Sequence, residues 1–312
     1  MKLVSFSHGK AASWGVVTDF GVVDVLARWQ GTEVPANLVE VLQCGQPCLE
    51  KIATISQSAS EFIPLKSVKF LAPLQRPGKI LALAGNYSEH IKEVGKALGL
   101  SESPRQTTVP RPFLKPVTCV LNPGEEISWP TYSEKIDYEL ELGVVIGKKI
   151  KCVGSDKAIA AVAGYTIVND VSARSVTFAK DRVKRPWDEF YDWLIGKWAD
   201  GFLPMGPYLV TSDEIPDIQN LKMELKVNGE TRQKANTNQM IYSVADIVSF
   251  LSHVMMLEPG DIIATGTPAG VAMASGKFLQ SGDTIEGAIE KLGVLHNTLS
   301  ERPKEFYMPL SR

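Results

Sequence analysis

The chain has 312 residues, of which 44% are hydrophobic, and a formal net charge of −2, values typical of a globular protein that buries a large core. The near-zero charge argues against the basic surface of a nucleic-acid-binding protein and against a polybasic lipid-binding patch, so we expect neither kind of partner. No segment approaches the roughly 20 uninterrupted apolar residues of a membrane span. Residues 1–21 contain no apolar run typical of a signal peptide, so we expect a cytoplasmic protein.

The four cysteines are Cys44, Cys48, Cys119 and Cys152, which is few for a chain of this length. Cys44 and Cys48 lie in a loop-like segment, LQCGQPC, with no histidine or second cysteine pair nearby, and this argues against a zinc site. Because cytoplasmic proteins keep their thiols reduced, we expect two free thiols at this place.

Residues 1–72 are expected to form a small N-terminal domain. Short apolar and β-branched runs predict strands at 3–7, 13–19 and 21–26, and an apolar, helix-like stretch follows at 38–42. The next segment, PLQRPGK, is rich in proline and glycine, which is typical of a boundary. We therefore expect a larger domain at 73–299 and a C-terminal tail at 300–312 that no motif reaches.

The larger domain is expected to be rich in strands. Its elements are predicted as strands at 79–86, 137–147, 163–170 and 257–268 and helices at 88–99, 172–183 and 243–257. Ser88 and Ser243 would cap the first and last of these helices. A hairpin is predicted at 221–235, because Asn228-Gly229 is typical of a type I′ turn. Strands dominate without a regular βαβ repeat, so the predicted fold class is α+β rather than a doubly wound sheet.

Two acids of the strand 137–147 are the first candidates for a site. Alternation along the strand places Asp137, Glu139 and Glu141 on one face, so the carboxylates of Glu139 and Glu141 point the same way. Unpaired, they would repel each other, and a hard cation between them would turn this cost into a gain. An E-x-E pair is often only a solvated strand face, but this strand continues into the apolar VVIG, as a core strand would.

Asp170 ends the strand 163–170 and can simply cap the helix expected after it. Together with Glu139 and Glu141 it would provide three oxygen ligands on one side of an octahedral ion, leaving positions for substrate and water. No histidine or cysteine lies close by in the sequence. We therefore predict a site for Mg²⁺ or Mn²⁺ rather than for zinc.

His90 and Glu93 lie three residues apart and share one face of the helix 88–99, so the carboxylate can orient the imidazole as a general base. The alternative is an ordinary surface pair. The remaining candidates are cationic or polar side chains in short motifs: Lys115, Arg174, Lys197, Thr265 and Thr267. The two lysines lie in apolar or aromatic surroundings, which is unusual for solvated charges. The threonines lie in TGTPAG, a turn whose backbone N–H groups can meet a carboxylate or simply form the turn.

From Pro73 to its end, about three-quarters of its length, the chain resembles the fumarylacetoacetate hydrolase superfamily. The resemblance rests on an ordered set of segments: GNYSEH, FLKP, DYELELGVVIG, GYTIVNDVSAR, GKWADGFLPMGPYLV, VNGETRQ and PGDIIATGTPAGV. It implies a mixed β-sandwich roll with a less constant N-terminal domain, usually assembled as a homodimer.

The resemblance also implies roles for single residues. Glu139, Glu141 and Asp170 would bind Mg²⁺ or Mn²⁺. His90 with Glu93 would activate a water molecule. The residues that would line the substrate site are Lys115, Lys197, Arg174 and Thr267, and one of the two lysines would stabilise developing negative charge.

The chain departs from the family pattern in two places. Many relatives have Asp directly after the arginine of NDVSAR and Gln two residues later, where this chain has Ser175 and Thr177. The segment between Arg174 and Lys197 is also longer and more aromatic than in the simplest members. Its residues 181–195 would form either a lid or wall of the pocket, or an amphipathic helix that supports a dimer interface.

The implied activity is hydrolysis of a carbon–carbon bond in a small 2-oxo acid of the acylpyruvate type. Such an acid offers a carboxylate and a keto oxygen to one metal ion, which would stabilise the enolate, while His90 deprotonates the attacking water. The same residues would also serve an oxaloacetate decarboxylase or tautomerase, or a 2-hydroxydienoate isomerase. A non-catalytic metabolite-binding relative ranks lowest, because all three metal ligands are present.

Overall fold

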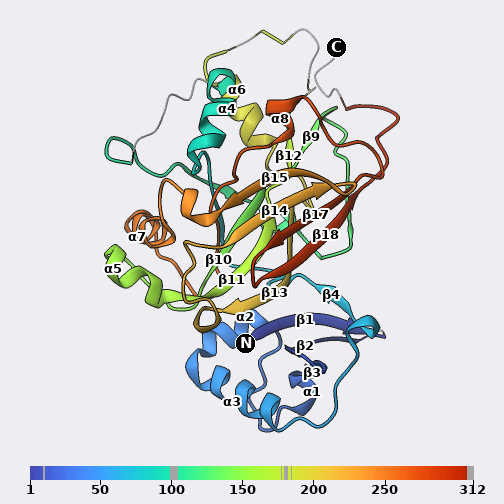
Figure 1. Cartoon of the computed structure of the whole chain (residues 1–312), viewed down its shortest axis with the longest axis vertical. Coiled ribbons are helices and arrows are strands. Elements are labelled where there is room, and N and C mark those ends of the chain that lie inside the picture. Colours follow the sequence, from blue (N-terminus) through green and yellow to red (C-terminus); the bar gives the residue numbers. More distant parts are fainter. Residues whose placement is uncertain (10, 99–104, 177, 179–181, 184, 308–312) are drawn as a thin grey trace.

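The computed structural model describes residues 1–9, 11–98, 105–176, 178, 182–183 and 185–307. It is a strand-rich α+β structure in which two sheets pack face to face and helices lie around them, as the sequence predicted (Figure 1). The N-terminal strands β1–β3 and helices α1–α3 form the lower part of this view. Among these residues, no helix combines the length and the apolar character that a membrane span requires.

The larger sheet joins strands from distant parts of the chain. In the described residues its strands follow the order β3-β2-β1-β13-β11-β10-β16-β5-β6, with β4 paired to β1 and β7 to β13. Neighbours run antiparallel except in the pairs β16–β5 and β13–β7. The strands are β1 (Lys2–His8), β2 (Ala11–Thr18), β3 (Gly21–Asp24), β4 (Lys69–Leu71), β5 (Ile80–Leu83), β6 (Pro112–Lys115), β7 (Val120–Leu121), β10 (Leu140–Ile146), β11 (Val162–Asn169), β13 (Leu203–Thr211) and β16 (Ile262–Ala264).

A second sheet, in the order β15-β14-β17-β18-β8, covers one face of the first, and β9 pairs with β12. These strands are β8 (Glu126–Ile127), β9 (Ile136–Asp137), β12 (Ser172–Ala173), β14 (Lys222–Val227), β15 (Glu230–Asn236), β17 (Thr284–Ile289) and β18 (Gly293–Leu299).

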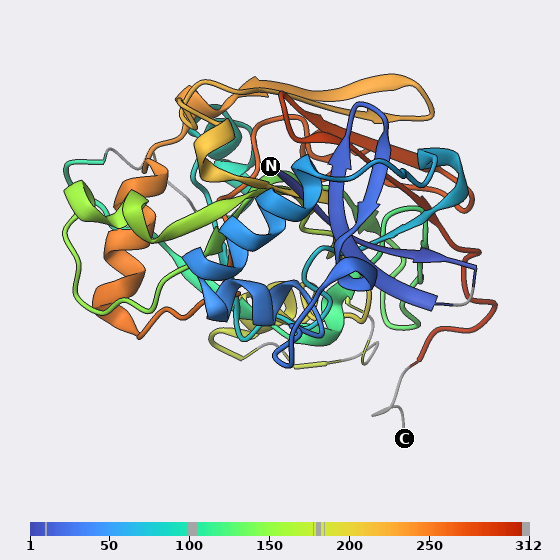
Figure 2. The ribbon, with the colours of Figure 1, turned by 90° about the horizontal axis from the view of Figure 1, so that it is seen from below.

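The helices are α1 (Val25–Arg28), α2 (Leu38–Cys44), α3 (Gln46–Gln57), α4 (Ser88–Leu98), α5 (Ser155–Ala158), α6 (Asp188–Ile195), α7 (Val244–Val254) and α8 (Ala272–Ser275). Short 3₁₀ turns are η1 (Leu65–Ser67), η2 (Val117–Cys119), η3 (Ile159–Ala161), η4 (Ser212–Glu214) and η5 (Thr237–Gln239). Seen from below, α5 and α7 lie side by side at one side of the molecule (Figure 2).

The central strand β10 decides which way the acidic side chains point. All of its residues are buried, as expected for a strand covered on both faces. Leu140 and Leu142 pack in one apolar cluster with residues of the second sheet, whereas Val145 packs in another cluster with N-terminal residues. Glu141 alternates with the leucines and therefore points away from the second sheet, to the side of Val145.

Two local predictions in this region are confirmed. Asn228 and Gly229 join β14 to β15, and both have positive φ angles, +50° and +80°, as a type I′ turn requires. Ser243 is the N-cap of α7: its side chain accepts a hydrogen bond from the Asp246 N–H, and the Asp246 side chain bonds back to the Ser243 N–H.

The N-terminal part shares the larger sheet with the rest of the chain. The strands predicted at 3–7 and 13–19 are present as β1 and β2, whereas the one predicted at 21–26 is present only to Asp24, as β3, because α1 begins at Val25. Strand β1 pairs with β13 through Lys2↔Val210 and Leu3↔Leu209. One apolar cluster contains Trp14 from this part together with Val168 of β11. The division into domains at residue 72 stays a prediction.

The helix predicted at 172–183 is wrong where the structure describes this segment. Ser172 and Ala173 form β12, which pairs with β9, and Val176 makes an isolated bridge with Ser133. The segment is extended because these partners, distant in sequence, bind its backbone. Residues 177, 179–181 and 184 lie outside the described part.

The strand predicted at 137–147 is interrupted. Tyr138 and Glu139 separate β9 from β10. The backbone N–H of Glu139 donates to the side chain of Asn169, and that of Leu140 donates to the side chain of Gln233. These side-chain oxygens replace the backbone carbonyl of a neighbouring strand as the acceptor. Buried backbone groups need such partners, and here side chains supply them.

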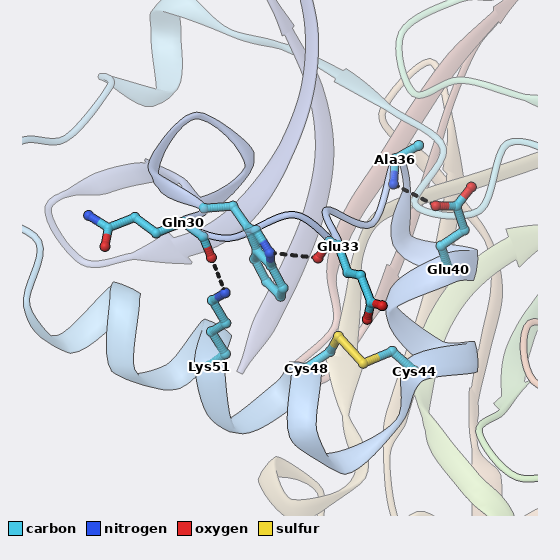
Figure 3. The surroundings of a disulfide bond; sticks show 8 residues. Gln30, Glu33, Ala36, Glu40, Cys44, Cys48 and Lys51 are labelled. Atoms are coloured by element: carbon cyan, nitrogen blue, oxygen red, sulfur yellow. Dashed lines mark hydrogen bonds between the residues drawn. A yellow bond between two sulfur atoms is a disulfide. The ribbon is translucent and has the colours of Figure 1, made fainter.

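Cys44 and Cys48 are joined by a disulfide, so the expectation of two free thiols is wrong (Figure 3). Cys44 ends α2, Cys48 lies in the first turn of α3, and Gly45, with φ +76°, turns the chain between them. This corner places the two Cα atoms 5.8 Å apart, within the usual range for a disulfide. The expectation of free thiols was based on the assumed cytoplasmic location. It contained no information on this corner between two helices, which sets the distance between the two cysteines. Cys119 and Cys152 are free thiols.

Candidate active site

Three carboxylates from two neighbouring strands meet at one point. Glu141 lies in β10, Glu139 just before it, and Asp170 directly after β11, which pairs antiparallel with β10. One carboxylate oxygen of each residue lies within 4.8 Å of the others, and all three side chains are buried. The structure thus brings together the three acids that we predicted as metal ligands, here called the acid cluster.

Glu141 shows how well the acid cluster fits a divalent cation. Its Oε2 accepts a hydrogen bond from the Gly266 N–H at 2.7 Å, but its buried Oε1 has no partner in the described part of the structure. Burial, reinforced by the charges of Asp170 and Glu139, holds the pKa of Glu141 well above its usual value. A cation would give Oε1 a partner and offset the repulsion, and three buried oxygen ligands suit Mg²⁺ or Mn²⁺.

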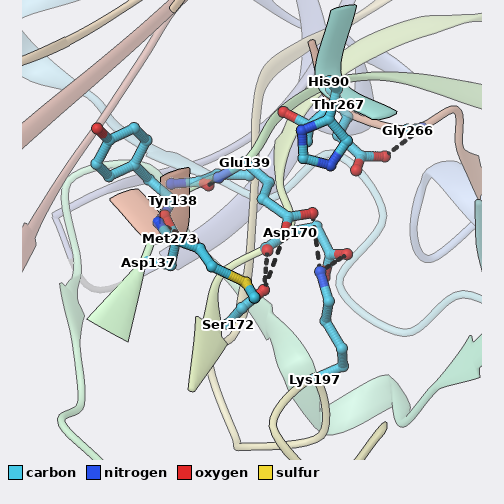
Figure 4. Close-up of polar contacts among 12 residues, drawn as sticks. His90, Asp137, Tyr138, Glu139, Asp170, Ser172, Lys197, Gly266, Thr267 and Met273 are labelled. Atoms are coloured by element: carbon cyan, nitrogen blue, oxygen red, sulfur yellow. Dashed lines mark hydrogen bonds and ion pairs between the residues drawn. The ribbon is translucent and has the colours of Figure 1, made fainter. Parts of the chain in front are cut away.

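Two buried lysines balance part of the negative charge. The Lys197 ammonium donates to Glu139 Oε2 at 2.8 Å and to Asp170 Oδ2 at 2.6 Å (Figure 4). Burial would lower the pKa of Lys197, but Asp170 and Glu139 outweigh it and raise the pKa, so the group is charged. The Lys115 ammonium donates to Asp170 Oδ1 at 2.6 Å and to the carbonyl of Lys197.

Arg174 connects Glu139 to Asp137. Its Nε donates to Asp137 Oδ2 at 2.9 Å and its Nη2 donates to Glu139 Oε1. The Ser172 hydroxyl donates to the same Glu139 oxygen at 3.3 Å. Burial would raise the pKa of Glu139, but the charges of Lys197 and Arg174 outweigh it and lower the pKa to about 2. Glu139 is therefore an anion at neutral pH.

His90 and Glu93 form the hydrogen-bonded pair that the sequence predicted. On α4, Nδ1 of His90 lies 3.1 Å from Oε1 of Glu93. The Gly270 N–H donates to both oxygens of Glu93, each at 3.0 Å, so a second element holds this carboxylate in place. Because Nδ1 is engaged, Nε2 is the ring nitrogen left to meet a substrate or a water molecule.

A cavity of about 720 Å³ opens beside these groups. Its polar end is formed by Arg174 together with His90, Glu139, Lys197 and Thr267. The last four are labelled in Figure 4. The other walls come from α4, from β6 and from the segment that ends in α6. The described residues of 181–195 that line the cavity are Arg182, 185–190, Asp192 and Trp193. The segment therefore forms a pocket wall, and its part in a dimer interface stays a prediction.

The model of the fumarylacetoacetate (FAA) hydrolase C-terminal family matches residues 79–300. The chain belongs to this family. It is 37% identical over 279 residues to oxaloacetate tautomerase FAHD2A, a mitochondrial protein of Bos taurus, covering 89% of this chain and 83% of that protein. It is 44% identical over 218 residues to the uncharacterized protein PH0643 of Pyrococcus horikoshii, covering 70% of this chain and 86% of that protein.

Solved structures of the FAA hydrolase family agree with the fold and with the metal. Maleylpyruvate hydrolase from Sphingobium sp. SYK-6, in complex with manganese(II) and pyruvate, matches with a TM-score of 0.75 at 26% identity. The match covers 97% of this chain and 100% of that chain. A related enzyme thus binds a divalent cation of the kind that the acid cluster fits.

Not every predicted residue of this FAA hydrolase family member reaches the cavity. Thr267 lines it and accepts a hydrogen bond from Gln233 Nε2 at 2.8 Å. Thr265 is fully buried and donates to the Leu142 carbonyl at 3.0 Å, a structural contact. Lys115 does not line the cavity, and its contacts orient Asp170 instead.

The structure describes only part of the first departure from the family pattern, the pair Ser175 and Thr177. Ser175 donates its backbone N–H to the Ser133 hydroxyl and does not line the cavity. Thr177 lies outside the described residues. The family resemblance implied a substrate contact at these positions, and Ser175 lies outside the cavity where such a contact would be made.

Sequence reasoning missed several residues that position the site. Asp137 was placed on the face of Glu139 and Glu141, but it accepts hydrogen bonds from the backbone N–H groups of Ala272 and Met273 at 2.6 and 3.1 Å. Gln233 holds both Thr267 and the backbone at the start of β10. The one available signal for Gln233 was its place at the end of the family segment VNGETRQ.

The C-terminal tail lies away from the cavity, since none of the described residues after Met273 lines it. Ser300 accepts a hydrogen bond from the Trp129 N–H, and Tyr307 donates one to the Thr131 carbonyl. We expect deletion of residues 300–312 to leave kcat per folded enzyme unchanged and to lower the melting temperature, because these bonds are lost. A steady-state assay with calorimetric melting tests this, and a large loss of kcat at an unchanged melting temperature would contradict it.

Proposed function

We propose that this chain is a divalent-metal-dependent enzyme that acts on the enolate of a small 2-oxo carboxylic acid and hydrolyses a carbon–carbon bond of an acylpyruvate-type substrate. The observation that supports this most directly is that His90, Lys197 and Glu139 line the same cavity. Glu93 is bonded to His90 from outside the lining, and the other two acids of the cluster are buried beside Glu139. The names of its relatives, a tautomerase, an isomerase and a hydrolase, support a catalytic role.

Each group has a part in this reaction. Glu139, Glu141 and Asp170 would hold Mg²⁺ or Mn²⁺, which supplies Lewis-acid stabilisation of negative charge on the oxygens of a 2-oxo acid. His90 Nε2 takes a proton from water as the water oxygen attacks the distal carbonyl carbon, and Glu93 stabilises the resulting imidazolium. Lys197 stabilises negative charge that develops on the substrate. The bond to the distal carbonyl then breaks, its electron pair passes to the enolate, and a proton is returned to the enolate carbon.

Tautomerisation of oxaloacetate is a second candidate, favoured by the 37% identity to a bovine oxaloacetate tautomerase. This reaction needs no water, because His90 as the base would take a proton from C3 of oxaloacetate and a proton would be returned to the C2 keto oxygen. Decarboxylation of oxaloacetate and isomerisation of a 2-hydroxydienoate use the same enolate. A solved 2-hydroxyhepta-2,4-diene-1,7-dioate isomerase from Mycobacterium marinum, 28% identical, supports including the last of these.

Assays with acetylpyruvate and oxaloacetate separate these reactions. With Mn²⁺ we expect release of acetate and pyruvate from acetylpyruvate, and loss of this activity when EDTA removes the metal. Oxaloacetate is followed by its enol absorbance and by CO₂ release. Loss of enol absorbance without CO₂ release and without cleavage of acetylpyruvate would assign a tautomerase. No metal-dependent reaction with either acid would contradict the proposal.

We also propose a homodimer, a cytoplasmic location and a domain boundary near residue 72. The homodimer is supported by the family resemblance. Light scattering, cell fractionation and limited proteolysis test these three points.

A further inference from the structure

Aromatic side chains form one wall of the cavity, next to the acid cluster. Phe113 and Trp193 pack edge to face with ring centroids 4.9 Å apart, and Phe190 stacks on Trp193 at 5.9 Å. We call these three residues the aromatic wall. The Lys197 ammonium lies 5.6 Å from the centroid of Phe113 and 5.9 Å from that of Trp193. Lys197 also donates a hydrogen bond to Glu139. Its side chain therefore lies between the aromatic wall and the acid cluster and contacts both.

The charges along the same side of the cavity balance each other. The lining residues comprise three cations and three acids: Arg111, Arg182, Arg185, Asp188, Glu189 and Asp192. Two of the cations are already paired, because Arg182 donates to Asp192 at 2.9 Å and Arg185 donates to Asp188 at 3.3 Å. The third cation, Arg111, is matched in number by the third acid, Glu189, so these six described side chains carry no net positive charge to attract a second carboxylate.

We propose that the distal group of the substrate is flat, uncharged and apolar, such as an aroyl or other conjugated acyl group, and that the aromatic wall selects it. The inference rests on the proposed function, which places the 2-oxo acid end at the acid cluster. A cavity of 720 Å³ is in the range that encloses drug-sized ligands, more than acetylpyruvate requires. A flat group gains from burial of its apolar area and from edge-to-face or offset contacts with the rings.

Equilibrium binding in the presence of Mn²⁺ tests the distal group without turnover. The three ligands are 2-oxobutanoate, 2-oxo-4-phenylbutanoate and 2-oxoglutarate, which share the 2-oxo acid end and are not 2,4-dioxo acids. By isothermal titration calorimetry we expect the phenyl compound to bind about 10- to 100-fold more tightly than 2-oxobutanoate, as burial of an aromatic ring predicts. We expect 2-oxoglutarate, with its distal carboxylate, to bind no more tightly than 2-oxobutanoate.

Two neighbouring variants assign the effect to the wall. Phe190 lines the cavity and is 49% exposed, whereas Tyr191 is 56% exposed on the same helix and does not line it. Both side chains are exposed enough for their removal to leave the core intact. We expect Phe190→Ala to reduce the advantage of the phenyl compound about 3- to 10-fold, the value of one aromatic contact. Tyr191 contacts Phe190 from outside the cavity, with ring centroids 5.7 Å apart, so Tyr191→Ala should reduce that advantage less than Phe190→Ala does. Both variants should bind Mn²⁺ as the wild type does.

The outcomes separate this inference from the proposed function. Equal binding of 2-oxobutanoate and the phenyl compound, or tighter binding of 2-oxoglutarate, overturns the inference and leaves the proposed function standing. An equal effect of Phe190→Ala and Tyr191→Ala also overturns it, because the wall would then not select the distal group. Absence of Mn²⁺-dependent binding of 2-oxobutanoate would contradict the proposed function itself.

Discussion

His90→Ala is expected to reduce kcat by about 10²- to 10⁴-fold, the usual effect of removing a general base, while Mn²⁺ affinity stays close to that of the wild type. The separation is expected because His90 is bonded to Glu93 and not to any of the three acids. Glu93→Gln should act in the same direction. The amide oxygen can still accept the Gly270 N–H, but a neutral side chain does not stabilise the imidazolium. Steady-state kinetics and Mn²⁺ calorimetry measure the two effects.

His253→Ala is the matched control for this experiment. His253 is exposed on α7, where its Nδ1 lies 2.9 Å from the Ser249 carbonyl, and it does not line the cavity. Its removal should change neither kcat nor Mn²⁺ affinity. Full activity of His90→Ala on every 2-oxo acid, alongside an inactive Glu141→Ala, would exclude the His90–Glu93 pair from catalysis. The reaction would then be that of a base-free lyase or of an isomerase with another proton carrier.

Glu141→Gln is expected to weaken Mn²⁺ binding by more than about 100-fold and to abolish turnover together with it. Loss of a residue that only supports a metal ligand costs about 10- to 100-fold in affinity, and loss of a ligand itself should cost more. Calorimetric titration of Mn²⁺ measures the affinity. Equal affinities in variant and wild type would contradict the assignment of Glu141 as a ligand.

Thermal melting distinguishes this loss from misfolding. Without metal, Glu141→Gln should be at least as stable as the wild type, because it removes a buried carboxylate that lies beside Asp170 and Glu139. Mn²⁺ should raise the melting temperature of the wild type by linkage and leave that of the variant unchanged. Glu258→Gln, which removes a carboxylate 49% exposed and bonded to Lys79, is the control and should respond to Mn²⁺ as the wild type does.

Features encoded in a few consecutive residues could be predicted from the sequence. Asn228-Gly229 specifies a turn whatever surrounds it, and Ser243 with Asp246 specifies the start of α7. The convergence of Glu139 and Glu141 with Asp170 was also predicted, from strand alternation and from the order of the family segments. The prediction holds although the strand is interrupted at Glu139.

Features that depend on a distant partner could not be predicted in this way. Ser172 lies in an extended segment because β9, far away in the sequence, pairs with it. Strand alternation predicts that Asp137 points to the same side as Glu139. In the structure its carboxylate accepts a hydrogen bond from the backbone N–H of Ala272. Lys115 lies in a sequence context that predicts a substrate-binding lysine. The fold instead places its ammonium group against Asp170, outside the lining of the cavity. In each case the deciding atom belongs to a segment that a local pattern does not contain.

The turn TGTPAG has a consequence for design. It contributes two backbone N–H groups, Gly266 to Glu141 and Gly270 to Glu93, so one short loop sets the position of a metal ligand relative to that of the base pair. A side chain at Gly270 would collide with the Arg232 carbonyl, 2.1 Å from the position of its Cβ. Transplanting the acids, the histidine and the lysine into another scaffold would therefore not reproduce this site. The graft would have to carry the loop with its length and its glycines.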